Sequence, residues 1–385
     1  MDKNFFTFKS LGGAYPALEN ELRLGTPTAV FGVSDVHKYL IASLFENKVL
    51  YLTADAVSAG RAYSAISAFS GKKCALIPAK DDVVLYKDAL SKDALFRRLS
   101  AIYSLADGAE VIVCDAESAM QLFPARLPSV RLTVGGDCDY SVLPQQLISM
   151  GYTREYSVES KGAFAVRGDI LDVYPVNCSN PVRIDFFGDT VEKIRPYDGV
   201  TGERLEEVCS VTIVSATDAP YTESDVRRIK AELSDGLKRC ADNTAFKRAK
   251  AIAEEIVTKL EGGAPFAGAS FVMPLLAGSC TLFDIIGKDA LIIFDECKLI
   301  GDRINGIFKE HTERIRELKK GGEAFDFSLK QLLSPEEIFA SFNKFKNLAV
   351  QTFTSSTQFF RPLKTFNFSS TPAPSYLNAV PQLIA

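Results

Sequence analysis

The sequence predicts an α/β fold in which a parallel-sheet domain is split by a smaller, mostly β module. Short apolar runs alternate with helical stretches in the first third of the chain, and this pattern resumes towards its end. Between these parts, residues 131–215 change to short strands and turns with one helical stretch. Alternation of buried strands with helices is typical of an open parallel sheet, and short strands between turns indicate a separate β module.

The first half of the parallel-sheet domain is predicted over residues 1–130. Short apolar runs predict strands at 48–53, 74–77 and 110–114. Apolar residues at helical spacing predict helices at 56–69 and 91–105. Pro124 and Pro128 then interrupt the pattern, and we expect a hinge there.

The second half is predicted over residues 216–352. Apolar side chains recur at helical spacing from Thr222 through Leu260, which predicts one long amphipathic helical region. The elements expected after it are buried strands at 271–276 and 290–294, a helix at 310–320 and a last strand at 350–353. Residues 353–385, rich at first in Ser, Thr, Phe and Pro, are expected to be a linker or an extended C-terminal arm.

Composition places the chain among globular proteins. Its 385 residues are enough for about two or three domains, and 47% of them are hydrophobic. A net charge of −4 argues against a protein held to nucleic acid mainly by its phosphates. No run reaches the roughly 18 apolar residues of a membrane span, and the N-terminus does not resemble a signal peptide. We therefore expect a cytoplasmic protein without a membrane partner.

The chain offers few groups for metal binding or for acid–base chemistry. Its two histidines are His37 and His311, and none of its eight cysteines lies in a C-x-x-C spacing. No zinc cluster, Ser-His-Asp set or Cys-His dyad can be assembled, so we expect no catalytic residue, no metal and no cofactor. Four cysteines beside apolar runs are interpreted as reduced, buried thiols: Cys74, Cys114, Cys138 and Cys297.

Gly32 and Lys38 have the spacing of a phosphate-binding loop, G-x-x-x-x-G-K-[ST], ahead of a helical segment. His37 replaces the second glycine of that motif, and its Cβ takes the room that a phosphate needs. Tyr39 replaces the Ser or Thr whose short hydroxyl holds magnesium. The spacing could also have arisen by chance.

Asp295 and Glu296 directly follow the apolar run 291–294. Helicase-type motors use two acidic residues after a buried strand to hold magnesium and activate water. The alternative is a strand end with two solvated carboxylates. Together with Gly32 and Lys38, the pair suggests a nucleotide site that has lost its chemistry, and we expect no ATP hydrolysis.

Residues 182–197 predict a β-hairpin that turns at residues 188–189. Alternate residues of its first strand lie on opposite faces, so Arg183, Asp185 and Phe187 share the face that points away from the core. An outward Phe beside an outward Arg is an unusual use of a surface unless another protein covers it.

These features resemble the UvrB-like N-terminal module of the bacterial transcription-repair coupling factor family (Mfd). The motifs that carry the resemblance are specific and long, and they are Gly151-Tyr152-Thr153-Arg154, Gly162-x-Phe164-x-x-Arg167-Gly168-Asp169-x-Leu171-Asp172-x-Tyr174-Pro175, Arg183-x-x-Phe186-Phe187 and Ile194-Arg195-x-x-Asp198. The resemblance covers essentially the whole chain. It implies a degenerate RecA-like domain, with halves 1a (1–130) and 1b (216–352), split by a UvrA-binding domain 2 (131–215).

UvrB itself is the alternative within this resemblance, as a nucleotide-dependent protein that recognises DNA damage and has an unusual phosphate loop. Two departures count against it. UvrB keeps Gly-Lys-Thr where this chain has His37-Lys38-Tyr39. It also carries a long tyrosine-rich β-hairpin that clamps damaged DNA, and residues 79–91 leave no room for one.

The resemblance implies that Arg167, Arg183 and Phe187 grip UvrA, because they match positions that the family uses for this contact. An Arg fork pairs with carboxylates, and a Phe between two forks can fill a pocket. Asp172 and Asp185 belong to the same candidate surface, although each could simply orient a neighbouring Arg.

An intramolecular alternative remains for each of these three side chains. Arg167 could cap the turn at Gly168-Asp169, and Arg183 could pair with Glu192 across the hairpin. Phe187 could fold onto its own module.

The resemblance also implies partners. UvrA is the expected partner of this chain. In the full-length family member, an ATP-dependent DNA translocase, the C-terminal part covers domain 2, and RNA polymerase and DNA bind later domains. We expect this chain to be the N-terminal portion alone, a non-catalytic module that binds UvrA constitutively. The competing classes are an active nucleotide-dependent DNA-remodelling enzyme and a direct DNA binder, the latter disfavoured by the acidic balance.

Overall fold

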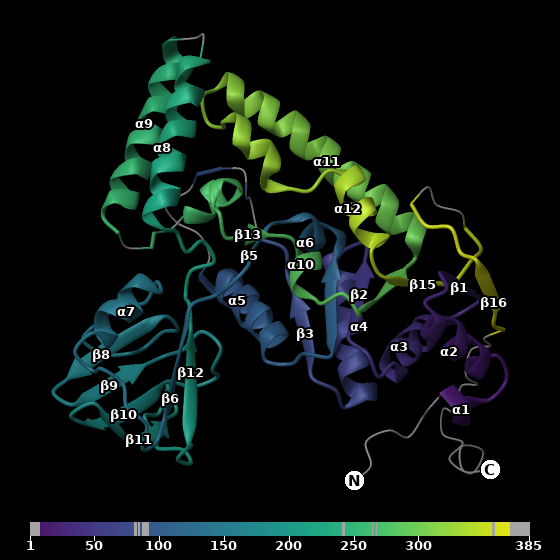
Figure 1. Ribbon diagram of the computed structural model, residues 1–385, viewed down its shortest axis with the longest axis horizontal. Coiled ribbons are helices and arrows are strands. Elements are labelled where there is room, and N and C mark those ends of the chain that lie inside the picture. Colours follow the sequence, from purple (N-terminus) through teal and green to yellow (C-terminus); the bar gives the residue numbers. More distant parts are fainter. Residues whose placement is uncertain are drawn as a thin grey trace.

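A parallel sheet forms the centre of the protein (Figure 1). The computed structural model describes residues 8–80, 83, 85–86, 92–240, 243–263, 265–266, 268–355 and 359–369. The strands of the central sheet are β1 (Thr28–Phe31), β2 (Val49–Thr53), β3 (Cys74–Ile77), β4 (Val111–Asp115), β14 (Leu291–Asp295), β15 (Lys346–Gln351) and β16 (Lys364–Asn367). They lie in the order β16-β1-β15-β14-β2-β4-β3, and every neighbouring pair is parallel.

Helices cover both faces of this sheet, which explains why its central strands are apolar throughout. One face is covered by α2 (Tyr15–Leu24), α3 (Asp35–Leu44) and α4 (Ala56–Ser70). The other is covered by α5 (Lys92–Ala106), α6 (Ala116–Met120), α10 (Leu282–Ile285), α11 (Cys297–Lys320) and α12 (Pro335–Phe342). A short helix, α1 (Phe8–Leu11), precedes α2. The predicted α/β fold with a parallel sheet is confirmed.

The inserted module comprises the elements from β6 to β12. It contains β6 (Ser129–Thr133), α7 (Leu143–Ser149), β7 (Thr153–Arg154), β8 (Ala163–Arg167), β9 (Ile170–Val173), β10 (Val182–Phe187), β11 (Thr190–Pro196) and β12 (Ser210–Val214). Five of these strands form a sheet in the order β11-β10-β9-β8-β7, and β6 pairs with β12. The predicted hairpin is confirmed as β10 and β11, which pair antiparallel.

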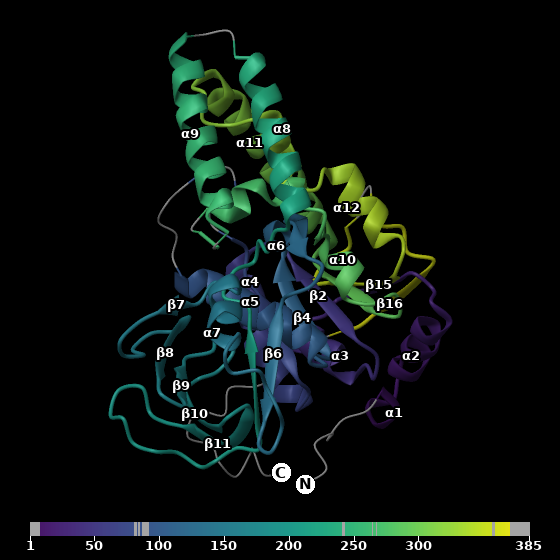
Figure 2. The ribbon, with the colours of Figure 1, turned by 60° about the vertical axis from the view of Figure 1, so that its left-hand side comes forward.

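α5 belongs to two hydrophobic cores. Phe96 and Leu99 pack into the core of the inserted module, whereas Ile102 and Leu105 pack beneath the parallel sheet. The contact with the module is close, because a Cβ on Gly162 would lie 2.8 Å from Phe96 Cζ. The module is therefore packed against the parallel-sheet domain through this helix, as Figure 2 shows.

A helical hairpin extends from the parallel-sheet domain (Figures 1 and 2). The single helical region predicted from Thr222 to Leu260 is two helices, α8 (Glu223–Lys238) and α9 (Asn243–Glu261), which lie side by side. A capping box between Thr222 and Asp225 begins α8. Amphipathic spacing alone could not reveal the break, because both helices keep one apolar stripe.

The prediction of a strand at 271–276 was wrong. These residues form a 3₁₀-helix, η1 (Ala269–Leu275), that packs against a second one, η2 (Asp326–Gln331). Pro274 has no N–H for a sheet ladder, and a short apolar run does not distinguish a buried strand from a buried helix. Nearby, Pro124 lies in β5 (Phe123–Pro124), which pairs with β13 (Ser279–Cys280) at the predicted hinge.

The C-terminal part of the described chain also differs from prediction. The strand expected at 350–353 begins earlier, as β15, and is not the last one. Within the expected linker, β16 pairs with β1 at the edge of the parallel sheet. A free edge strand offers unpaired backbone groups, which explains how a polar, apparently irregular segment becomes a strand. Residues 356–358 and 370–385 lie outside the described part.

All eight cysteines are free. Cys114 and Cys297 are buried as expected, whereas Cys74, which begins β3, and Cys138, which lies in the loop between β6 and α7, are only half-buried. Along the residues that the structure describes, no helix has both the length and the apolar composition needed to cross a membrane.

Candidate docking surface and nucleotide-like site

Lys38, Asp295 and Glu296 come together at the carboxyl edge of the parallel sheet. Asp295 ends β14, and Lys38 reaches it from α3, which follows β1. Lys38 Nζ lies 2.9 Å from Asp295 Oδ1 and 2.7 Å from Glu296 Oε1. Only 2% of Lys38 is exposed. The structure thus brings the two halves of the predicted site together, and the alternative of two solvated carboxylates does not hold for Asp295.

Both carboxylates have further donors from the chain. Tyr51 Oη donates to Asp295 Oδ2 at 2.9 Å, and the Thr352 N–H donates to Glu296 Oε1 at 2.7 Å. Burial raises the pKa of Asp295, against the opposing effect of Lys38. Burial would also raise the pKa of Glu296, but the hydrogen bonds from Lys38 and Thr352 outweigh it and lower that pKa. Burial alone would lower the pKa of Lys38, and the two carboxylates raise it.

Glu296 holds its position in an unusual backbone conformation. Its φ is 62°, and within the described residues it is the one non-glycine with a positive φ. This left-handed conformation costs an ordinary side chain roughly 1–2 kcal/mol. The bonds that Glu296 accepts from Lys38 and Thr352 offset part of that cost.

The chain turns sharply at Gly32, where the Phe368 backbone lies directly against it. Gly32 has a φ of 75°, and a Cβ built on it would lie 1.9 Å from Phe368 O. The Phe368 N–H donates to Phe31 O at 2.9 Å. Helix α3 already begins at Asp35, so Lys38 lies one turn inside the helix. A phosphate loop instead wraps several backbone N–H groups around its ligand.

The two residues that replace the motif's Gly and Ser/Thr face different surroundings. Tyr39 packs into the core beneath α3 and α4, with its ring 6.0 Å from that of Tyr51. Burial raises the pKa of Tyr39. His37 is half-buried, and its Nδ1 finds no hydrogen-bond partner in the described part of the chain. Neither side chain supplies the short hydroxyl that a magnesium ion would need.

The second candidate site is the outward face, by which we mean the side of the five-stranded sheet opposite the module's core. The register places two rows of side chains there. The first row is Ala165, Asp172, Arg183 and Arg195, and the second is Arg167, Ile170, Asp185 and Lys193. Phe187 follows at the end of β10. The predicted sharing of one face by Arg183, Asp185 and Phe187 is confirmed.

Arg183 grips Asp172 rather than Glu192. Arg183 Nε donates to Asp172 Oδ1 at 2.7 Å, and Nη2 donates to Oδ2 at 2.8 Å. Asp172 is only 4% exposed, whereas 39% of the Arg183 side chain is accessible. The hydrogen bonds to Asp172 raise the pKa of Arg183. Two of the five guanidinium N–H groups are thus committed to Asp172.

Asp185 pairs with Arg195, so both acidic candidates orient an arginine. Arg167 does not cap the turn at 168–169. It donates from Nη2 to Tyr156 O at 2.7 Å and lies with its guanidinium 5.1 Å from the centre of the Tyr156 ring. Phe187 does not fold onto the module, because 76% of it is exposed. Sequence reasoning missed Tyr156, Lys193 and Arg195 as members of this face.

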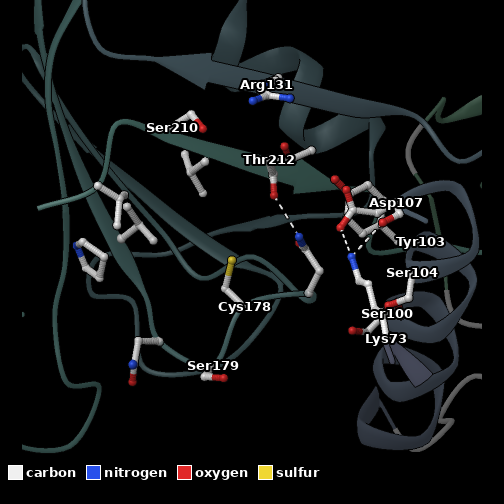
Figure 3. A pocket seen from close by; sticks show the side chains of 16 residues that line it. Lys73, Ser100, Tyr103, Ser104, Asp107, Arg131, Cys178, Ser179, Ser210 and Thr212 are labelled. Carbon is white, nitrogen blue, oxygen red and sulfur yellow. Dashed lines mark hydrogen bonds and ion pairs between the residues drawn. The ribbon is translucent and has the colours of Figure 1, made fainter. Parts of the chain in front are cut away.

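A separate cleft of about 590 Å³ lies between the inserted module and α5 (Figure 3). Lys73 and Asp107 pair on one wall, and Asn177 Nδ2 donates to Thr212 O at 3.0 Å on the other. None of the candidate site residues lines this cleft. The predicted short connection over 79–91 lies largely outside the described residues. In the described part, no group of three or more His, Cys, Asp or Glu side chains could hold a metal ion.

Comparison with known proteins places both sites in one context. Residues 130–218 match the family described as the UvrB interaction domain. The transcription-repair-coupling factor of Myxococcus xanthus is 30% identical over 304 residues, which is 75% of this chain and 25% of that protein. The UvrABC system protein B of Pseudothermotoga lettingae is 27% identical over 300 residues, 69% of this chain and 45% of that protein.

The chain therefore spans about a quarter of one relative and under half of the other. Its parallel sheet with an inserted antiparallel sheet is consistent with a RecA-like, UvrB-like fold. The chain is thus related over most of its length to the transcription-repair-coupling factors and to UvrB, and its residues 130–218 match the UvrB interaction domain.

Proposed function

We propose that this chain is a docking module that recruits UvrA for DNA repair. The observation that carries the proposal is the exposure of Phe187 beside the Arg183–Asp172 pair, on the outward face of a UvrB interaction domain. A large exposed ring next to arginines has the composition of an interface hot spot. In this proposal Phe187 fills a recess of UvrA, and Arg183 and Arg167 bind carboxylates around it.

The charge of the outward face supports an acidic partner surface. The two paired rows of the face carry four cations, Arg167, Arg183, Lys193 and Arg195, against two acids, Asp172 and Asp185. The exposed Glu192 lies at the bulge of β11 beside them. The whole chain has a net charge of −4, so these rows are positive against an acidic background. Complementary charge speeds association and is screened by salt. Binding should therefore weaken as ionic strength rises.

The proposal also assigns the parts of the chain. Residues 1–130 and 216–352 are the two halves of a RecA-like domain, and residues 131–215 are the UvrA-binding domain. By analogy with the longer coupling factors, later domains would bring RNA polymerase and DNA, and a C-terminal part would cover the outward face. In the proposal, the outward face as it is exposed among the described residues is the surface that binds UvrA.

The parallel-sheet domain is proposed not to hydrolyse ATP. Lys38, which would bind phosphate in an active site, donates to Asp295 and Glu296 instead. The Phe368 backbone takes the space in front of Gly32, and Tyr39 is packed in the core. In this arrangement Lys38 is engaged by two carboxylates and the turn at Gly32 is closed by Phe368, whereas phosphoryl transfer would require the lysine at the phosphate.

Calorimetric titration of the purified chain with purified UvrA tests the docking function. We expect binding by the wild type and a loss of about 2 kcal/mol or more for Phe187→Ala. Val142→Ala is the matched control, because Val142 is also exposed and apolar but precedes α7, which packs on the inner side of the sheet. Equal affinities for wild type and Phe187→Ala would contradict the proposal.

A nucleotide-dependent enzyme is the second candidate function. The similarity of this chain to UvrABC system protein B favours that candidate. A fluorescent ATP analogue and a phosphate-release assay separate the two. If the chain is a docking module, we expect neither saturable binding of the ATP analogue nor release of phosphate. Turnover that disappears in Lys38→Ala would establish the enzyme instead.

A further inference from the structure

We infer that Tyr156 is an additional contact residue of the outward face and that, with Arg167, it forms a platform for a carboxylate beside an apolar patch of the partner. The inference rests on the proposed function, because it concerns the same docking surface. It assigns a binding role to a residue that the sequence motifs do not include.

Tyr156 is displayed rather than packed. It lies in the connection between β7 and β8, and 89% of it is exposed. The guanidinium of Arg167 lies over its ring, at 5.1 Å from the ring centre. An arginine over an aromatic ring gains about 0.5–1 kcal/mol at an exposed site, which favours this arrangement before any partner arrives.

Arg167 keeps most of its hydrogen-bonding capacity. In the described part of the chain it gives one hydrogen bond, from Nη2 to Tyr156 O at 2.7 Å. Arg183, by contrast, commits two N–H groups to Asp172. Four of the five N–H groups of Arg167 therefore remain for an incoming carboxylate. Because stacking already orders the side chain, binding loses less conformational entropy.

The position of the pair extends the docking surface. Arg167 begins the second row of the outward face, and Lys193 on β11 ends it. Phe187 lies at the end of β10, next in line on the same face. A partner that covers Phe187 and reaches Arg167 also meets the Tyr156 ring. Tyr is among the residues most enriched in hot spots, since a large ring is ordered at little entropic cost.

The ring of Tyr156 has little role in the fold. Arg167 bonds the main-chain oxygen of Tyr156, which any residue at this position provides. Removal of an exposed ring from a loop should change stability by no more than about 0.5 kcal/mol. Binding and folding can therefore be separated at this residue.

The test compares Tyr156→Ala and Tyr156→Phe with the control Val142→Ala in titrations with purified UvrA. We expect at least about a tenfold loss of affinity for Tyr156→Ala, and wild-type affinity for Tyr156→Phe, which keeps the ring, and for the control. Wild-type affinity of Tyr156→Ala, in a titration where Phe187→Ala binds weakly, would overturn the inference and leave the docking function standing. Absence of binding by the wild-type chain would remove both.

A double-mutant cycle with Arg167→Ala distinguishes contact from positioning. If the ring touches the partner, Tyr156→Ala weakens binding further in the Arg167→Ala background. If the ring only orients Arg167, the second substitution has no effect there, and the contact role is overturned.

Discussion

Lys38 Nζ and Asp295 Oδ1 lie 2.9 Å apart, although 257 positions separate the two residues in the sequence. Both side chains are buried, so the pair links α3 to the end of β14 from within the domain. In an active nucleotide site the equivalent lysine binds a phosphate instead. The interaction is therefore internal to the fold.

Replacement of Lys38 by Met should destabilise the protein. The substitution keeps most of the apolar stem but leaves Asp295 without its counter-charge, and breaking a buried pair costs about 3–5 kcal/mol. Urea unfolding at neutral pH measures the change. Lys73→Ala is the control, because its pair with Asp107 is exposed and should contribute less than about 1 kcal/mol. Equal losses in the two variants would refute a special role for the buried pair.

Gly32→Ala should displace the strand at the sheet edge. A methyl group there would meet Phe368 O at 1.9 Å, and the residue also has a positive φ. Gly108→Ala is the matched control, since Gly108 has a φ of 83° with open space around it. We expect faster amide hydrogen exchange over 364–367 in Gly32→Ala alone. Unchanged exchange would mean that β16 tolerates the contact.

Arg183→Ala and Phe187→Ala should both weaken UvrA binding, but only one should weaken the fold. Loss of the exposed Phe187 ring should leave stability within about 0.5 kcal/mol. Loss of Arg183 leaves the buried carboxylate of Asp172 without its hydrogen-bond donor, which should lower the free energy of unfolding by about 1–3 kcal/mol. Thermal unfolding, run beside the titrations, checks this division. A fully stable Arg183→Ala would show that Asp172 finds another donor.

His311 should make stability fall on mild acidification. It is buried on α11, with Nε2 3.3 Å from Leu329 O, and burial lowers its pKa below 6.5. The folded pKa is below the unfolded one, so this stability is fully present above about pH 6.5 and is lost as pH falls through the folded pKa. His311→Phe should flatten the difference between pH 7 and pH 5 in urea unfolding. Parallel pH profiles for variant and wild type would assign the slope to other groups.

Much of the fold could be predicted because burial leaves a direct trace in the sequence. Strands buried on both faces read as continuous apolar runs, as in β2 and β4. The alternation around Arg183 gave the outward face correctly, since side chains alternate along a strand. Lys38 and Asp295 could be assigned to one site because phosphate loops, and acidic residues after a buried strand, have known roles in nucleotide sites.

The remainder depends on geometry that no local pattern encodes. Continued from the turn at 188–189, the register would pair Arg183 with Ile194. A bulge after Asp185 shifts the pairing, so Arg183 lies beside Arg195 instead. One inserted residue thus brings both Lys193 and Arg195 onto the outward face. Likewise, β16 forms only because β1 offers it an edge, and that edge is a tertiary property.

The two-sided packing of α5 has a mechanical consequence. A module joined to the parallel-sheet domain by chain connections alone would rotate freely, and a protein bound to the module would rotate with it. Here, any such rotation would first have to withdraw Phe96 and Leu99 from the hydrophobic core of the inserted module. A protein bound to the five-stranded sheet is therefore held in a fixed orientation relative to the rest of the molecule.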